Sequence, residues 1–186
     1  MIYCFGDSLT YGYGVAPREC WPVLLAELGG KKCVNLGVNG DTTSYVLQRI
    51  KAHIKSHEYE KGSIAIVMAG ENDVLMYGAN GYDVQNVLTA CECLKGAGAT
   101  PIAVVQPGFV PSRLPFYGGM DVDKLNQNHD AFADALLEEC NSRGIITVDL
   151  RRVFGNRTDL YIDGVHLTPE GHWMIAEAMN KELALL

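Results

Sequence analysis

The chain has 186 residues, of which 48% are apolar and 20% are charged, and its formal net charge is −7. This length suits one domain with a substantial core, and the apolar content excludes a disordered chain. The acidic balance and the lack of a Lys/Arg block argue against nucleic acid or an anionic membrane surface as the main partner. No run of about 18 apolar residues is present, so the sequence predicts no membrane span.

Strand-like and helix-like segments alternate along the whole chain. The apolar run 1–5 predicts a first strand, and residues 17–28 predict a helix with one apolar face that ends at a glycine pair. Further strands are expected at 32–36, 63–68, 101–106 and 145–149. Further helices are expected at 83–95, at 122–143, from about 168 onward, and from the capping residues 41–44 to about 56. This alternation predicts a three-layer α/β/α fold around a five-stranded parallel sheet of flavodoxin-like order, in a single domain over residues 1–186.

The cysteines and the N-terminus bear on the cellular compartment. Six cysteines are present, and none belongs to a Cys-x-x-Cys pair, so we interpret most of them as reduced packing residues. The chain enters a strand pattern directly, with no charged segment followed by an apolar segment and a cleavage site. We therefore expect a cytoplasmic protein, or a secreted one whose signal is absent from this sequence.

The first candidate site follows the first strand, in the stretch Phe5-Gly6-Asp7-Ser8-Leu9-Thr10-Tyr11-Gly12. Gly6 allows a sharp turn, which offers Ser8 at the carboxyl end of a strand, where open α/β sheets bind their ligands. Ser8 is suited there to be a nucleophile. The alternative is that Ser8 only caps the next turn or helix, and this stretch alone does not separate the two.

Three later loops also carry polar groups at strand ends or close to a helix start. Gly40 lies in Asn39-Gly40-Asp41-Thr42, where a glycine lets the backbone N–H approach a ligand, and Asn72 follows a buried strand and can aim its amide into the cleft. Asp163 and His166 share one tight turn, so the carboxylate can orient the imidazole and leave its second nitrogen free as a base. The alternatives are an ordinary turn with a helix cap, an Asx turn, and a surface histidine.

Together these loops bring a hydroxyl, a base, a carboxylate and two hydrogen-bond donors to the same edge of the predicted sheet. A hydroxyl becomes a good nucleophile when a base removes its proton, and the resulting oxyanion needs fixed donors. These groups are the parts of serine acyl transfer.

The same blocks resemble the GDSL or SGNH hydrolases over nearly the whole chain. Gly6-Asp7-Ser8-Leu9, Gly40, Gly70-x-Asn72-Asp73 and Asp163-x-x-His166 match the four blocks of that family in order and spacing. Trp21-Pro22 and the residues around Gly40 are similar to the thioesterase/lysophospholipase branch and its arylesterase relatives. Glu71 departs from the pattern, because many members have glycine at this place.

The resemblance implies a role for each matching residue. Ser8 would be the nucleophile, His166 the general base and then acid, and Asp163 the residue that orients His166. The backbone N–H groups of Ser8 and Gly40 and the side chain of Asn72 would form the oxyanion hole. The reaction would be hydrolysis of an ester or thioester through an acyl-enzyme, with no metal and no cofactor.

Several other residues could take part in a site or have a purely structural role. His53 and His57 lie four apart on a predicted helix, but we interpret them as solvated because no carboxylate partner is evident. Tyr11 and Tyr13 either line the cleft or cover the core. The loop 107–120 carries more apolar side chains than a solvated loop needs. It is predicted to form a substrate pocket, an oligomer contact or a cover for its own core, with these residues as pocket candidates: Phe109, Leu114, Phe116 and Tyr117.

The sequence favours a small-molecule substrate, a short-chain acyl ester, because the chain is compact and has no lid domain. A carbohydrate acetylesterase is the second choice, and a lysophospholipase or acyl thioesterase stays open. An alternative of another class is a non-catalytic α/β domain that binds a small ligand. Oligomeric state is not predicted.

Overall fold

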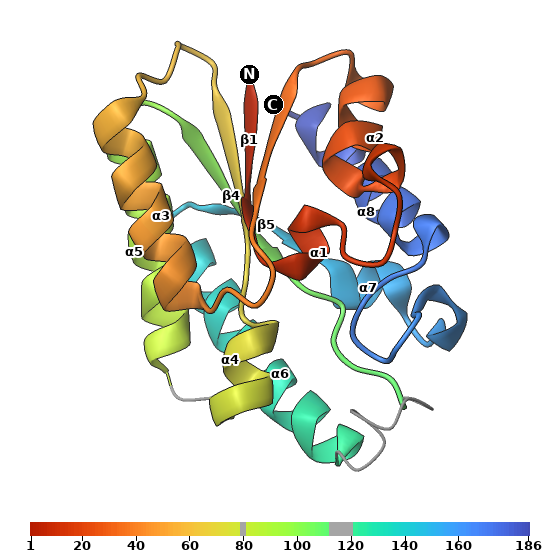
Figure 1. Ribbon diagram of the computed structural model, residues 1–186. Helices are drawn as coiled ribbons and strands as arrows, with labels where there is room; N and C mark the ends of the chain where they lie inside the picture. The colour runs from red at the N-terminus through yellow and green to blue at the C-terminus, as the bar shows by residue number, and fades with distance from the viewer. Residues whose placement is uncertain (79–80, 112–120) are drawn as a thin grey trace.

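The computed structural model describes residues 1–78, 81–111 and 121–186, and its centre is a five-stranded sheet (Figure 1). The strands are β1 (Ile2–Gly6), β2 (Cys33–Gly37), β3 (Ile64–Met68), β4 (Thr100–Val105) and β5 (Ile146–Asp149). They lie in the order β2-β1-β3-β4-β5, and every neighbouring pair is parallel. The predicted flavodoxin-like α/β fold is confirmed.

Strand register brings the candidate loops to one edge of the sheet. Gly6 at the end of β1 is aligned with Gly37 on β2 and with Met68 on β3. Because parallel strands end at the same edge, the residues that follow these three positions share one side of the molecule. The first three sequence blocks therefore start from neighbouring strand ends.

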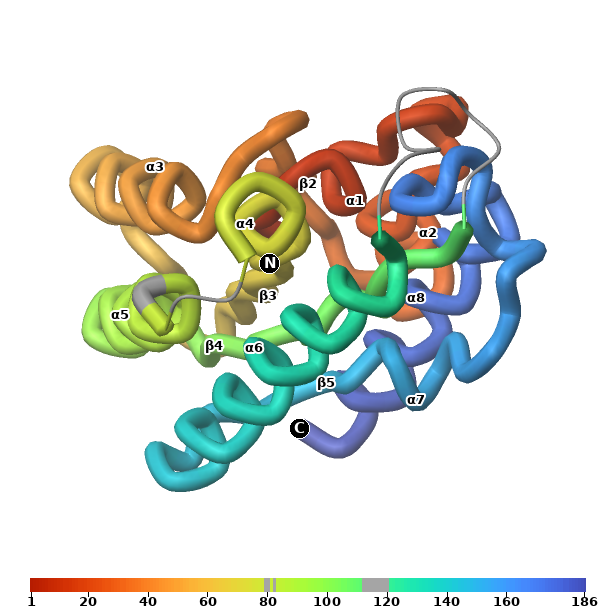
Figure 2. Tube along the Cα trace, turned by 90° about the horizontal axis from the view of Figure 1, so that it is seen from below, coloured from red at the N-terminus to blue at the C-terminus, as the bar shows by residue number. Residues whose placement is uncertain are grey.

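Helices cover both faces of the sheet (Figure 2). On one face lie α3 (Thr43–Ser56), α5 (Tyr82–Gly96) and α6 (Val122–Ser142), and on the other lie α2 (Trp21–Gly29), α7 (Leu150–Phe154) and α8 (Pro169–Leu183). Ile66 and Val67 show how one strand serves both layers, because adjacent side chains of β3 enter opposite cores. Both faces of the central strands β1, β3 and β4 are thus buried, as the continuous apolar runs predicted, while the edge strands β2 and β5 are only partly buried.

The single helix expected over 17–28 is divided in two. A 3₁₀ turn covers Pro17–Glu19, Cys20 is extended, and α2 begins at Trp21. The physical reason is Pro22, since inside a continuous helix its ring would clash with the carbonyl four residues earlier. In the first turn of a new helix the missing N–H of proline costs nothing.

Three short helices were not predicted as helices. They are α1 (Ser8–Tyr11), α4 (Glu71–Tyr77) and α7 (Leu150–Phe154). Each has seven residues or fewer, which is too short to show helical periodicity in the sequence. The block around Asn72, which also allowed an Asx turn, is in fact the first turn of α4.

The cysteines and helices add two facts about the chain as a whole. All six cysteines are free thiols, and four of them are buried. In the described part of the chain, no helix is both long and apolar enough to cross a membrane.

His172 on α8 is fully buried and links two helices. Its Nδ1 accepts a hydrogen bond from the Trp21 backbone N–H at 3.4 Å, and its Nε2 has no partner among the described residues. Burial, helped by the charge of His166, lowers the pKa of His172 to about 4. The native state therefore holds this imidazole neutral.

We expect His172→Gln to reduce the acid sensitivity of the fold. The unfolded chain takes up a proton on this imidazole below pH 6.5 and the native state does so only near 4, so acidification through this window destabilises the native state. The contribution is about 3 kcal/mol at most. Denaturant unfolding at pH 7 and at pH 4.5 measures it, and the glutamine variant should lose less free energy of unfolding than wild type. An equal loss in both proteins would reject this account.

Candidate active site

Ser8 lies at the first position of α1, directly after β1. Asp7 caps this helix by accepting the Leu9 backbone N–H on its carboxylate at 3.0 Å. Gly6 makes the turn possible, since a Cβ there would lie 2.2 Å from the Thr10 Oγ1 and 2.5 Å from the Met68 carbonyl oxygen. The strand therefore turns at once into the helix and presents the serine at the sheet edge.

His166 and Asp163 lie in the loop before α8, where His166 contacts Ser8 and Asp163 contacts His166. The Nε2 of His166 is 3.0 Å from the Ser8 Oγ, and its Nδ1 is 2.6 Å from the Asp163 Oδ2. A β-bridge between Tyr161 and Leu167 closes the loop, and the Ile162 N–H donates to the His166 carbonyl at 2.8 Å. The structure thus brings these three predicted site residues into one hydrogen-bonded chain.

The carboxylate of Asp163 is held ionised by its surroundings. Burial alone would raise its pKa, but the His166 side chain and the backbone N–H groups of His166 and Val165 all donate to it, and together they lower the pKa below its usual value. An ionised acceptor at Nδ1 fixes the histidine tautomer with its lone pair on Nε2. That lone pair faces the Ser8 hydroxyl.

Asn72, in the first turn of α4, contacts the loop that carries Gly40. The Asn72 side-chain amide donates one N–H to the carbonyl of Asp41 at 2.9 Å, and its second N–H has no hydrogen-bond partner among the described residues. Gly40 has φ of +79°, and a Cβ built there would meet nothing within 4 Å, so this turn faces open space. In the described part of the chain, no backbone hydrogen bond outside the helices and strands uses the Gly40 N–H.

Arg49 on α3 binds the loop that carries Gly40 through the side chain of Asp41. The sequence did not predict this role. Its guanidinium donates to the Asp41 carboxylate at 2.6 Å and to the carbonyl oxygens of Leu36 at 2.6 Å and Gly6 at 2.8 Å. One side chain therefore joins the ends of β1 and β2 to the loop between β2 and α3. The planar fork of an arginine suits such a triple contact, and a lysine could not reproduce it.

Acidic side chains gather beneath the site. Burial raises the pKa of Asp7 to about 6, against the hydrogen bonds that it accepts. Burial likewise raises the pKa of Glu71 well above its usual range, with the charges of Asp7 and Asp163 adding to the effect. The unusual Glu71 is only 2% exposed, and its Oε1 has no partner among the described residues. These surroundings favour the neutral form of Glu71.

The structure also places the aromatic candidates. The Tyr13 ring lies over His166, with ring centroids 4.3 Å apart, and remains 47% exposed, so it borders the site. Tyr11 is 54% exposed. Phe109 is 6% exposed, packs edge-on against His129 with ring centroids 5.8 Å apart, and lines two hollows of about 440 and 10 Å³, so it stays a pocket candidate. The pocket candidates Leu114, Phe116 and Tyr117 lie outside the described residues.

His53 and His57 lie close together near the C-terminal end of α3. Their rings stack with centroids 4.0 Å apart, and the Nδ1 of His53 is 2.9 Å from the Tyr59 hydroxyl. Among residues 1–78, 81–111 and 121–186, no group of three or more His, Cys, Asp and Glu side chains could hold a metal ion.

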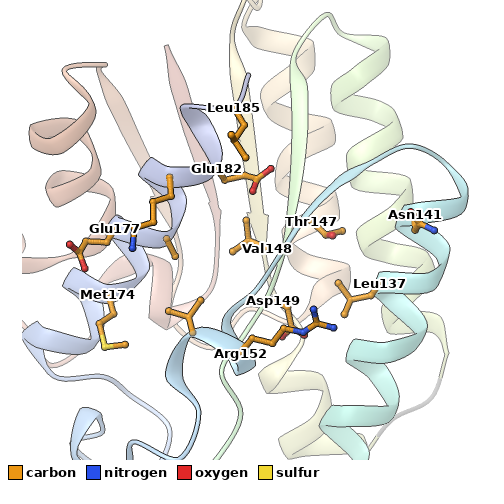
Figure 3. Close-up of a pocket in the computed structure, with 13 residues that line it drawn as sticks. Leu137, Asn141, Thr147, Val148, Asp149, Arg152, Met174, Glu177, Glu182 and Leu185 are labelled. Carbon is orange, nitrogen blue, oxygen red and sulfur yellow. The ribbon is translucent and has the colours of Figure 1, made fainter.

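A groove of about 730 Å³ lies at the β5 edge of the sheet, away from these residues (Figure 3). Thr147 and Val148 of β5 form its floor, with Leu137 of α6 and Met174 of α8 beside them. It contains a mixture of acidic and basic side chains and none of the predicted site residues. Size alone therefore does not locate the chemistry of this protein.

A parallel α/β sheet that carries a hydroxyl, an imidazole and a carboxylate in one hydrogen-bonded chain at its carboxyl edge has the arrangement of a serine hydrolase. The chain belongs to the GDSL-like lipase/acylhydrolase family, whose model matches residues 4–174. The resemblance seen in the sequence blocks is confirmed.

Individual relatives agree with this assignment. Thioesterase 1/protease 1/lysophospholipase L1 of Escherichia coli K12 is 27% identical over 184 residues, which cover 98% of this chain and 82% of that protein. The aryl esterase of M. smegmatis superposes with a TM-score of 0.85 at 18% identity, over 100% of this chain and 98% of that one. A carbohydrate acetylesterase from Sinorhizobium meliloti gives 0.79 at 20% identity, over 99% and 98%.

Proposed function

We propose that this protein is a serine esterase that hydrolyses short-chain carboxylic esters through an acyl-enzyme. The observation that carries the proposal is the chain of contacts from the Ser8 Oγ to the His166 Nε2 at 3.0 Å and from the His166 Nδ1 to Asp163 at 2.6 Å. This is the geometry that removes a proton from a serine hydroxyl.

The reaction follows from these contacts in two stages. His166 takes the Ser8 proton while the Oγ attacks the ester carbonyl, and the imidazolium then gives that proton to the departing alcohol. A water molecule loses a proton to His166 in the same way, attacks the acyl-serine and releases the carboxylic acid and free Ser8. Asp163 stabilises the imidazolium in each stage and does not itself take up the proton.

The negative oxygen of the tetrahedral intermediate needs donors on the side opposite His166. As the first residue of α1, Ser8 has a backbone N–H with no acceptor within that helix. The N–H of Gly40 and the second N–H of Asn72 are further donors, so the start of α1, the Gly40 loop and the first turn of α4 offer one donor each. We propose that these donors form the oxyanion hole.

Asn72→Ala should lower kcat by about 10²–10³-fold with a smaller change in KM. The amide is needed mainly when charge develops on the carbonyl oxygen, so its loss raises the barrier of the chemical step more than it weakens substrate binding. Steady-state kinetics with an acetyl ester measures both constants. Asn141→Ala, on the last turn of α6, is a matched control that should leave kcat unchanged. A wild-type kcat in Asn72→Ala would remove this residue from the oxyanion hole.

The acyl preference tests the proposal itself. We expect turnover of p-nitrophenyl esters to be highest for acetyl to butyryl and to fall toward palmitoyl. The longest chains need an apolar channel, and the apolar hollow beside Val165, lined also by Leu75 and Leu125, measures only about 10 Å³. A labelling assay with a serine-reactive phosphonate runs in parallel. Folded protein that neither turns over an ester nor takes the label would favour the non-catalytic binding domain.

One observation favours a sugar acetate as the second candidate substrate. A hollow of about 440 Å³ is lined in part by the polar residues Asn156 and Thr158 and by Val110, whose N–H donates to the carbonyl of Gly164 next to Asp163. Hydroxyl groups of a sugar would find hydrogen-bond partners there. Acetylated xylose, an acyl thioester and a lysophospholipid belong in the same assay, and faster turnover of any of these would replace the simple ester as the preferred substrate.

A further inference from the structure

Gln106 follows β4 and joins two of the loops that form the site. Its Nε2 donates to the Asp7 Oδ2 at 2.8 Å, and its Oε1 accepts the backbone N–H of Glu71 at 2.9 Å. Gln106 and both of its partners are no more than 2% exposed. One buried amide therefore spans from the turn that carries the nucleophile to the first turn of α4.

At the first end of this bridge, Gln106 fixes the carboxylate that caps α1. Asp7 accepts the Leu9 N–H on Oδ1 and the Gln106 amide on Oδ2, so both carboxylate oxygens are held. Ser8 lies between Asp7 and Leu9 in the chain. The orientation of the Asp7 side chain therefore sets the position of the Ser8 backbone.

At the second end, Gln106 satisfies the first N–H of α4. The early N–H groups of a helix have no acceptor inside it, so the Gln106 carbonyl supplies one to Glu71. Asn72 is the next residue. The start of α4 is also pressed against α6, because a Cβ on Gly70 would lie 2.5 Å from the Phe132 ring.

We propose that Gln106 is a positioning residue that sets the distance between the Ser8 nucleophile and the Asn72 donor by holding Asp7 and the Glu71 N–H on one rigid amide. This inference rests on the proposed function, since it assigns the bridge to the esterase reaction. Gln106 itself is buried and does not touch the substrate. The bridge acts mainly on the chemical step, because a misplacement of about 1 Å between reacting groups costs on the order of 10²-fold in rate.

The bridge can be reversed, which provides the test. Gln106→Glu keeps an acceptor for the Glu71 N–H but sets a carboxylate against Asp7, and Asp7→Asn sets an amide against the Gln106 amide. The double variant restores both hydrogen bonds with amide and carboxylate exchanged. We expect each single variant to lose kcat on the order of 10²-fold with little change in KM, and the double variant to recover most of that loss.

Two controls separate positioning from a general loss of stability. Cys140→Ala removes a buried group near the C-terminal end of α6 and should lower the unfolding temperature without changing kcat. If Gln106→Glu does not fold, Gln106→Met removes both hydrogen bonds without adding charge and should show the same loss of kcat. A double variant no better than the single ones, or Gln106 variants with a wild-type kcat, would overturn the inference.

Ser8→Ala in the same assay distinguishes the two possible failures. If turnover does not depend on Ser8, the proposed function fails and the inference about Gln106 fails with it. If Ser8→Ala is inactive while the Gln106 variants keep full kcat, the proposed function stands and only the bridge is rejected.

Discussion

Ser8→Ala is expected to lower kcat in a p-nitrophenyl acetate assay by about 10⁶-fold, leaving a residual acceleration on the order of 10³–10⁴-fold over the uncatalysed reaction from the oxyanion donors and substrate binding. The alanine methyl group cannot attack the carbonyl, so no acyl-enzyme forms. His166 remains oriented by Asp163, but it then has no hydroxyl within 3.0 Å to activate. Binding of the ester should persist, since the oxyanion donors and the surrounding loops are unchanged.

The matched control is a second serine on the surface. Ser142→Ala, at the last residue of α6, loses a hydrogen bond to the Glu139 carbonyl and should keep full activity and full phosphonate labelling. Ser8→Ala should take up no label while its unfolding temperature stays close to that of wild type. Activity that survives in folded Ser8→Ala would assign the nucleophile to another group and withdraw the acyl-enzyme mechanism.

The fold was accessible from the sequence because its signals are local and repeated. Each strand is a short apolar run, and runs such as 63–68 are apolar on both faces, which is typical of a covered parallel sheet. Alternation with helices then restricts the topology strongly. Two local details were not predicted correctly. Pro22 divides the helix expected over 17–28 through a steric clash, which the spacing of apolar residues does not show. Helix α4 has only seven residues, too few to show helical periodicity.

The candidate site divides in the same way. Asp163 and His166 are three residues apart, so their contact could be predicted from one short segment. Ser8 could be predicted because the glycine turn at Gly6 lies close to it in the sequence. Arg49 and Gln106 act across 43 and 99 residues, respectively, from their partners on the nucleophile turn, and neither has a neighbouring motif that signals its role. Such residues become visible only when the register of the sheet brings their partners together.

The sequence identified Glu71 as unusual for the family but did not predict its surroundings. The departure from glycine marked the position, but only the structure places the side chain in a buried, acidic setting near Asp7 and Asp163. The carboxyl group of Glu71 is compatible with an ionised Asp163, because burial favours the neutral form of Glu71. Glu71 therefore adds no second negative charge beside Asp163 in its neutral form.

Asp163→Asn is expected to lower kcat by about 10⁴-fold while leaving Ser8 and His166 in contact. The amide that replaces the carboxylate can donate to His166 Nδ1, and this favours the tautomer with its proton on Nε2. An Nε2 that already carries a proton cannot accept one from Ser8. The imidazolium also loses the negative charge beside it. Steady-state kinetics at pH 7 to 8 measures the loss, and Asp159→Asn, a surface carboxylate paired with Arg157, is the control that should keep its activity.

Asp163→Asn should also change how the free energy of unfolding depends on pH. The native pKa of Asp163 lies below its unfolded value, so its ionised form stabilises the fold at pH values above about 4, and this contribution is lost as the pH falls through the native pKa. Wild type should therefore exceed Asp163→Asn in free energy of unfolding at pH 7, and the difference should narrow toward pH 3. A difference in free energy of unfolding that does not change with pH would show that ionisation of Asp163 does not stabilise the native state. The assignment of Asp163 as the charge that stabilises the His166 imidazolium would then be rejected.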